Sequence, residues 1–172
     1  LCKVMILAHI YLFGTKSIGM MSANREGCAQ TFREIHWIIQ ANPILMGKWD
    51  KTYLSNGMQR MQFKDGGSIV VLAATDAAPR GRSIELFFVD ELLNVDEAAW
   101  AAANFTTIAK PNAVVLTASS AGHKGSAVLN QMRDKAIADK TPSLGRLEWS
   151  ALPSRKLRDR KGYIEAQPAL GH

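Results

Sequence analysis

The sequence has few cysteines, no long apolar run and no phosphate-binding loop of the Gly-x-x-x-x-Gly-Lys-Ser/Thr type. Its two cysteines, Cys2 and Cys28, show neither metal-ligand spacing nor a disulfide framework, so a reducing cytoplasmic setting is expected. The apolar stretch from Val4 to Phe13 is too short to cross a bilayer. It also lacks the basic start and the cleavage site of a signal peptide.

The chain has 172 residues, of which 47% are hydrophobic, so there is room for one domain with a real core. It begins at Leu1, without an initiator Met, inside an apparently established helix, and we therefore expect a preceding segment. The net charge of +6 favours a polyanionic partner only mildly. Six of the basic residues lie between Arg146 and Lys161, in a segment that fits either a solvated face or a nucleic-acid contact.

Helical and strand patterns alternate along the chain, which predicts an α/β layered fold. Cys28, Phe32, Ile35 and Ile39 recur at helical spacing, and the residue before Pro43 should end that helix. Asp65-Gly66-Gly67 predicts a β-hairpin turn. Further helices are expected over 1–13, 94–106 and 126–139, with strands over 17–22, 68–74, 84–89, 113–117 and 147–149. Asn24 is a candidate N-cap for the helix that contains Cys28. The continuous apolar run over 113–117 predicts a buried strand.

The stretch Ile84-Glu85-Leu86-Phe87-Phe88-Val89-Asp90-Glu91 predicts a strand buried on both faces that ends in two carboxylates. Open α/β sheets bind ligands at the carboxyl ends of their strands. A strand followed by Asp-Glu is the pattern of a Walker B motif, in which the first acid helps to hold Mg²⁺ and the second acts on water. Surface acids at a helix start explain these eight residues equally well.

Two neighbouring features strengthen the first interpretation. Arg80 and Arg82 precede the acidic strand, and the predicted strand 113–117 ends in hydroxyl residues, Thr117 to Ser120. Phosphoryl transfer uses these residue types, since hydroxyls can bond the γ-phosphate and an arginine can neutralise transition-state charge. Other candidates are weaker: His36 borders an apolar stripe, Gly14–Ser17 follows a helix, and Gly122–Ser126 lacks motif spacing.

These residues resemble the large terminase subunits of tailed phages, which are ATP-driven DNA-packaging motors. The most specific match is Arg80-Gly81-Arg82-Ser83 before Leu86-Phe87-Phe88-Val89-Asp90-Glu91. Leu116-Thr117-Ala118-Ser119-Ser120 is similar to the family's coupling motif. Weaker matches are Ser22-Ala23-Asn24, Ala41-Asn42-Pro43, Ser55-Asn56-Gly57, Leu147-Glu148-Trp149-Ser150 and Ala166-Gln167-Pro168-Ala169-Leu170-Gly171.

The resemblance implies a three-layer, P-loop NTPase-like sheet of mostly parallel strands flanked by helices, with a β-hairpin and without the P-loop strand. Residues 1–172 would form a partial ATPase domain. The P-loop would lie before Leu1 and a nuclease domain after His172, so the fragment should hydrolyse ATP poorly by itself.

The resemblance also implies roles for individual residues. Asp90 would coordinate Mg²⁺, and Glu91 would be the catalytic carboxylate. Arg80, or else Arg82, would be an arginine finger that acts across a subunit boundary. Thr117 and Ser119 would belong to the nucleotide-sensing coupling motif.

The implied function is Mg-ATP hydrolysis coupled to the packaging of double-stranded DNA into a capsid. The implied partners are DNA, the portal protein, the small terminase subunit and further copies in a ring. The place of action would be the host cytoplasm, with no membrane association. Two alternatives stay open: another P-loop DNA motor or helicase, and a non-catalytic basic DNA-binding or assembly module. The motor hypotheses require Asp90 and Ser119 to lie at adjacent parallel strand ends around a common cleft.

Overall fold

The structure is a computed structural model that describes residues 1–23, 25–55, 59–73, 83–138, 143–156 and 158–167. The chain divides into two compact units, Leu1–Gln131 and Met132–His172. The first unit contains the sheet and the core. Arg80 and Arg82 lie outside the described residues, as does Asn24, the expected helix cap.

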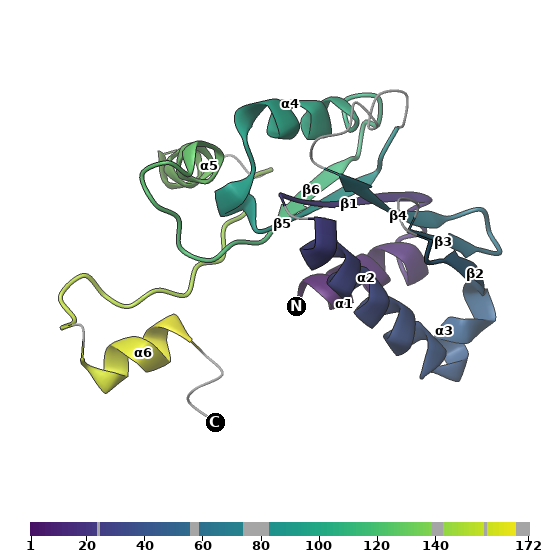
Figure 1. Cartoon of the computed structure of the whole chain (residues 1–172), viewed down its shortest axis with the longest axis horizontal. Helices are drawn as coiled ribbons and strands as arrows, with labels where there is room; N and C mark the ends of the chain where they lie inside the picture. The colour runs from purple at the N-terminus through teal and green to yellow at the C-terminus, as the bar shows by residue number, and fades with distance from the viewer. Residues whose placement is uncertain (24, 56–58, 74–82, 139–142, 157, 168–172) are drawn as a thin grey trace. The chain divides into compact units, whose positions relative to one another are not determined.

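A mixed six-stranded sheet in the order β2-β3-β4-β1-β5-β6 forms the centre of the first unit (Figure 1). Its strands are β1 (Ser17–Ser22), β2 (Trp49–Tyr53), β3 (Arg60–Phe63), β4 (Ser68–Ala73), β5 (Leu86–Asp90) and β6 (Val114–Thr117). Strands β4, β1, β5 and β6 are mutually parallel, while β3 pairs in antiparallel fashion with both β4 and β2. The predicted hairpin is the β3–β4 pair, with Gly66 at a positive φ of 85° in its turn.

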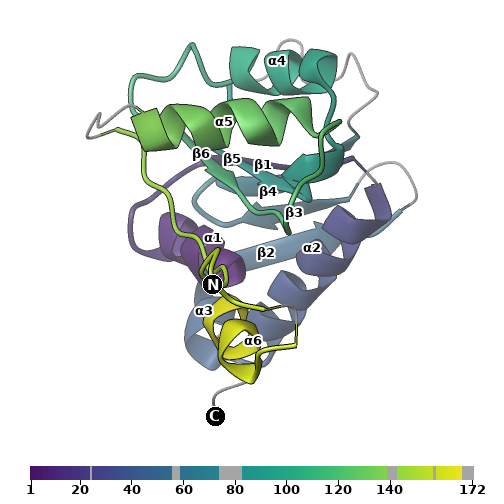
Figure 2. The same ribbon diagram turned by 90° about the vertical axis from the view of Figure 1, so that its left-hand side faces the viewer.

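Helices lie on both faces of this sheet, so the first unit has three layers (Figure 2). Helices α1 (Cys2–Tyr11), α2 (Arg25–Gln40) and α3 (Pro43–Lys48) lie toward one face, and α4 (Glu97–Phe105) covers the other. The chain continues through a 3₁₀ turn, η1 (Leu92–Asn94), and through α5 (Ala127–Ala138) and α6 (Arg160–Ala166). The expected α/β fold class is confirmed.

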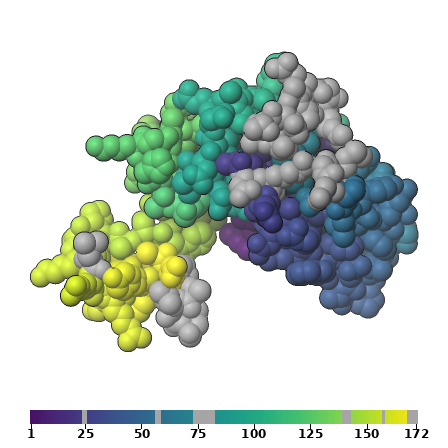
Figure 3. All heavy atoms as spheres, in the orientation of Figure 1, coloured from purple at the N-terminus to yellow at the C-terminus, as the bar shows by residue number. Residues whose placement is uncertain are grey.

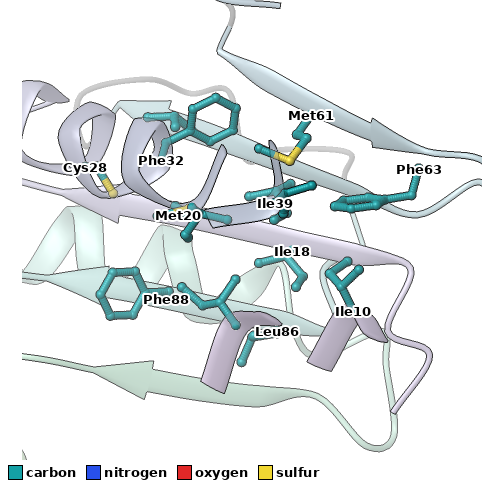
Figure 4. Packing of buried hydrophobic residues seen from close by; sticks show 14 residues of the cluster. Ile10, Ile18, Met20, Cys28, Phe32, Ile39, Met61, Phe63, Leu86 and Phe88 are labelled. Atoms are coloured by element: carbon teal, nitrogen blue, oxygen red, sulfur yellow. The ribbon is translucent and has the colours of Figure 1, made fainter. Parts of the chain in front are cut away.

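The main core lies between α1, α2 and the sheet (Figure 4). The predicted stripe of α2 is confirmed, because Cys28, Phe32, Ile35 and Ile39 are all fully buried. They pack with Met20 of β1 and Phe88 of β5. Fully burying an aliphatic or Phe side chain of this kind contributes about 1.5–3 kcal/mol. This contact fixes α2 above the central strands.

The outer faces of α2 and α3 lie on the surface of the first unit (Figure 3), where Trp37 and Ile44 are exposed. Helix α3 was not anticipated from the sequence. It begins because the side chain of Asn42 accepts hydrogen bonds from the amides of Ile44 and Leu45. Pro43 occupies the first turn, where its missing N–H costs nothing.

Three sequence expectations need correction. Strand β6 is not fully buried: it is an edge strand of the described sheet, so its residues are exposed or half-buried. Residues 147–149 do not form a strand. Helix α4 is nine residues long, shorter than the helix expected over 94–106, and it packs through the buried Ala99 and Ala103.

The amino ends of the parallel strands are held by ion pairs. Asp65, in the hairpin turn, accepts from the ammonium groups of Lys16 at 2.7 Å and Lys48 at 2.9 Å. These lysines hold the pKa of Asp65 well below its ordinary range. Glu85, just before β5, pairs with Lys110 at 3.2 Å and accepts from the Lys16 amide. These contacts tie the beginnings of three strands together.

The second unit contains α6, and Arg155 is its main polar anchor. The Arg155 guanidinium donates to Glu165 and lies 3.5 Å from Asp159. The side chain of Asp159 also caps α6 by accepting from the Lys161 amide at 2.9 Å. None of the described helices is long and apolar enough to cross a membrane.

Candidate functional site

Asp90 and Glu91 lie where the sequence pattern places them, at the carboxyl end of a buried strand. Leu86 to Val89 are at most 1% exposed, and Asp90 is the last residue of β5. The neighbouring strand β6 is parallel to β5, with Thr117 in register with Val89. Ser119 follows two residues later, so the acids and the hydroxyls meet at one edge of the sheet. The strand part of the condition set for the motor hypotheses is therefore fulfilled, and the common cleft stays a prediction.

The backbone of Glu91 has a left-handed conformation, with φ 51° and ψ 48°. Among the described residues, it is the one residue other than glycine with a positive φ. Its amide donates to Asp90 Oδ1 at 3.0 Å, which holds the tight turn after the strand. This conformation is unfavourable for a residue with a side chain, and such strain clusters at functional sites. The turn leaves the Glu91 side chain exposed to solvent.

Hydrogen bonds join the turn after β5 to the turn after β6. The Ala118 amide donates to the Val89 carbonyl at 2.9 Å, and the Leu92 amide donates to the Ala118 carbonyl at 3.1 Å. The hydroxyl of Ser119 accepts from the Leu93 amide at 3.1 Å. Ser119 thus holds the backbone just after Glu91, while Thr117 is half-buried at the end of β6.

Sequence reasoning missed three residues beside Asp90. Thr31 of α2 lies with its hydroxyl 3.5 Å from Asp90 Oδ2. Burial, and secondarily the charge of Asp90, raise the pKa of the Cys28 thiol well above its ordinary value. Ser22, the last residue of β1, is in register with Asp90 and fully buried. A polar residue ending an otherwise apolar strand was the available signal for Ser22, as it was for Asp90.

Neither Asp90 nor Glu91 forms an ion pair within the part of the chain that the structure describes. The predicted arginine finger cannot be placed, because Arg80 and Arg82 are both outside that part. The two acids therefore face the carboxyl edge of the sheet without a described cation beside them.

The donor set fits Mg²⁺ bound together with phosphate groups. Magnesium in nucleotide sites is held by one or two carboxylates, hydroxyls, water and phosphate oxygens, rather than by a cage of protein ligands. Asp90 supplies a carboxylate, and the hydroxyls of Ser22 and Thr31 lie next to that carboxylate. The described residues contain no cluster of three or more acidic, histidine or cysteine side chains, which is compatible with this mode.

The weaker candidates from the sequence, His36 and the loops 14–17 and 122–126, make contacts of ordinary structural kinds. The His36 ring lies within hydrogen-bonding distance of Thr52 and 5.9 Å from the ring of Trp49, and burial lowers its pKa. Gly14 follows α1, whose C-cap is Leu12, and has a positive φ of 69°. It lies before the amino end of β1 rather than near the acids. In the loop before α5, Nδ1 of His123 accepts a hydrogen bond from the Gly125 amide at 3.0 Å.

The basic segment from Arg146 to Lys161 is partly neutralised by its own neighbours. Arg146 pairs with Glu148, and Arg155 pairs with Glu165 and Asp159. The expected contact with DNA stays a prediction.

Comparisons with known proteins bear on the fold. No protein-family model and no curated protein sequence matches the chain. The large terminase of bacteriophage HK97 has a similar structure, with a TM-score of 0.86 and 20% identity over 99% of this chain and 36% of that one. A large terminase from a thermophilic bacteriophage gives a TM-score of 0.58 at 12% identity, over 78% of this chain and 33% of that one. The ATPase domain of the Thermus phage P74-26 large terminase gives 0.54 at 11% identity, over 83% and 78%.

The second of these three proteins, from the thermophilic bacteriophage, has also been solved with ADP. In that form it matches with a TM-score of 0.51 at 13% identity, over 77% of this chain and 33% of that one. At these identities the similarity establishes the fold, which is that of phage large terminase structures. The chain spans about a third of the length of the first two proteins.

Proposed function

We propose that this chain is part of the ATPase motor of a phage terminase large subunit, which couples Mg-ATP hydrolysis to the packaging of double-stranded DNA. The observation that carries the proposal is the meeting of Asp90, Glu91 and Ser119 at adjacent parallel strand ends. The fold shared with large terminases supports it, as does the fact that one of those terminases has been solved with ADP.

In this proposal each residue has a separate role in ATP hydrolysis. Asp90 holds Mg²⁺, which neutralises charge on the phosphates, and Glu91 takes a proton from the attacking water. The exposed side chain of Glu91 can reach a water molecule because the left-handed turn directs the chain away from β5. Thr117 and Ser119 sense the nucleotide at the end of β6, and Arg80 neutralises the developing charge from a neighbouring subunit.

The site needs a phosphate-binding segment that this sequence does not contain. Within the described sheet, β6 is bonded to a neighbour on one side, so a further parallel strand can pair with its free edge. Such a strand would end beside Ser119 and could bring phosphate-binding amides next to the two acids. We assign the P-loop of the complete protein to this position.

The whole protein would act in the host cytoplasm as a ring of identical subunits. It would work with the portal protein and the small terminase subunit, and a nuclease domain would cut the DNA. The basic segment from Arg146 to Lys161 is our candidate for contact with DNA phosphates, which basic side chains bind without sequence preference.

The test is Glu91→Gln in the complete protein that carries this chain. We expect ATP turnover to fall by about 10²- to 10⁴-fold, because the general base is lost, while ATP binding persists. Steady-state ATPase assays and fluorescent-nucleotide titration measure the two effects. Glu85→Gln is the matched control, since Glu85 lies at the opposite end of β5 and pairs with Lys110. Wild-type turnover in Glu91→Gln would remove the catalytic role.

A further inference from the structure

The hydroxyl of Ser22 is buried without a partner beside the proposed metal-binding acid. Ser22 is fully buried, and its Oγ has no hydrogen-bond partner among the residues that the structure describes. Burying such a hydroxyl without a partner costs free energy, and proteins usually avoid it. An alanine at this position would fill nearly the same space at no such cost.

The position of Ser22 explains what the hydroxyl can do. Ser22 and Asp90 are register partners on adjacent parallel strands, which run about 4.8 Å apart. Both side chains point to the face covered by α2, as shown by the buried residues two positions earlier, Met20 and Phe88. The hydroxyl and the carboxylate therefore lie on neighbouring strands and on the same face of the sheet.

Thr31 approaches the same carboxylate from α2. Its hydroxyl lies 3.5 Å from Asp90 Oδ2, which is longer than the ordinary O–H···O distance of about 2.7–2.8 Å. Thr31 follows Cys28 by one helical turn, so the packing of the Cys28 stripe fixes it over the end of β5. Asp90 therefore has one loosely bonded hydroxyl and one unpartnered hydroxyl beside it, from two different elements.

We infer that Ser22 and Thr31 are positioning residues that orient the Asp90 carboxylate when it holds a divalent cation. Each hydroxyl donates to Asp90, which leaves the remaining lone pairs of the carboxylate for the cation. Partners of this kind, which bond a ligand rather than the metal, fix its orientation and strengthen binding. The inference rests on the proposed function, because it needs Asp90 to be a cation ligand.

The experiment measures Mn²⁺ affinity, by electron paramagnetic resonance of free Mn²⁺, in the complete protein with ADP present. We expect Ser22→Ala and Thr31→Val each to weaken Mn²⁺ binding about tenfold. Two variants serve as controls and should stay within about twofold of wild type. Thr31→Ser keeps the hydroxyl, and Ser17→Ala removes a hydroxyl from the opposite end of β1.

Urea unfolding of the same variants separates positioning from folding. Because Ser22→Ala removes an unpartnered buried hydroxyl, its unfolding midpoint should equal or exceed that of wild type. Mn²⁺ affinity unchanged in both Ser22→Ala and Thr31→Val would overturn the inference. So would an equal loss in Thr31→Ser and Thr31→Val, because the methyl packing and not the hydroxyl would then matter.

Asp90→Asn distinguishes this failure from failure of the proposed function. If Asp90→Asn abolishes Mn²⁺ binding while the hydroxyl variants bind normally, the positioning role alone is wrong. If Asp90→Asn binds Mn²⁺ like wild type, then Asp90 is no cation ligand and both proposals fail.

Discussion

Both ends of the parallel strands carry an Asp and a Glu, but the two ends differ in whether these carboxylates form ion pairs. At the amino end, Asp65 and Glu85 are paired with lysines and backbone amides. At the carboxyl end, Asp90 and Glu91 have no ion pair within the described residues. Asp90 accepts from the Glu91 amide at 3.0 Å and has one long contact with the Thr31 hydroxyl. Acids at the first end hold strand beginnings together, whereas we propose that acids at the second end act on a ligand.

The turns at the two ends also differ in the residue that adopts the left-handed backbone conformation. The hairpin turn at Asp65 uses Gly66 for its left-handed residue, so the turn carries no strain. The turn after β5 places Glu91 in that conformation, at a cost of roughly 1–2 kcal/mol for a residue with a side chain. The structure thus has a relaxed turn where acids stabilise and a strained turn where we propose that they act.

The largest expected effect is the loss of ATP turnover when Arg80 is removed. We propose that Arg80 supplies positive charge at the carboxyl end, as Lys16 and Lys48 do at the amino end. Arg80→Ala in the assembled complete protein should reduce ATP turnover by about a thousandfold or more, because the transition-state charge loses its partner. Steady-state ATPase measurements provide the test. Lys156→Ala, which removes one charge from the basic segment, should leave turnover nearly unchanged.

Mixing subunits tests whether Arg80 acts across a subunit boundary. Rings that combine Arg80→Ala with Glu91→Gln subunits should regain activity, since some interfaces then have both an intact arginine and an intact acid. No recovery in the mixed rings would argue against action in trans.

The amino end should respond in stability rather than in catalysis. We expect Asp65→Asn to lower the free energy of unfolding by about 1–2 kcal/mol at pH 7, because two charged hydrogen bonds are lost. The pKa of folded Asp65 is depressed, so its stabilisation is complete above the ordinary value of 3.8 and declines as the pH falls below it.

Urea unfolding from pH 7 to pH 3 should therefore show the gap between wild type and Asp65→Asn shrinking at the acid end. A gap that is independent of pH would mean that the ion pairs with Lys16 and Lys48 do not provide the stabilisation. ATP turnover of the variant at pH 7 should stay close to that of wild type.

The smallest expected effect comes from the strained turn. Glu91→Asn should raise the free energy of unfolding by about 0.5 kcal/mol, because Asn tolerates the left-handed conformation better than Glu. The same variant should lose ATP turnover. Thermal unfolding and an ATPase assay on one sample measure both. A clear loss of stability would show that the Glu91 side chain contributes to folding.

Patterns local to a single element predicted most of the fold and the centre of the candidate site. The stripe from Cys28 to Ile39 predicted α2, and the apolar run ending in Asp90 predicted both the strand and its acids. The Asp65-Gly66-Gly67 turn predicted the hairpin. Each signal depends on the chain within a few residues, where periodicity and turn chemistry are decisive.

Features that depend on distant contacts were not predictable in this way. Nothing in the sequence around Thr31 shows that α2 crosses the end of β5. The polar end of the 17–22 strand marks Ser22, but its register with Asp90 is visible only in the structure. The predicted strand over 147–149 failed because so short a segment forms a strand only where another strand can pair with it. Strand β6 was expected to be buried because its sequence does not reveal that it is an edge of the described sheet.

The hydrogen bonds between the two turns have a mechanical consequence. Leu92 and Leu93 are hydrogen-bonded to Ala118 and Ser119, so the two turns should move as one unit rather than as two independent loops. A ligand that displaced Ser119 would also displace Leu93, whose amide is hydrogen-bonded to Ser119. Leu93 is only two residues from Glu91 along the chain, so Glu91 would move as well. Glu91, which we propose acts on water, and the segment that we propose senses the nucleotide would then shift together. Moving one without the other would require breaking these hydrogen bonds first.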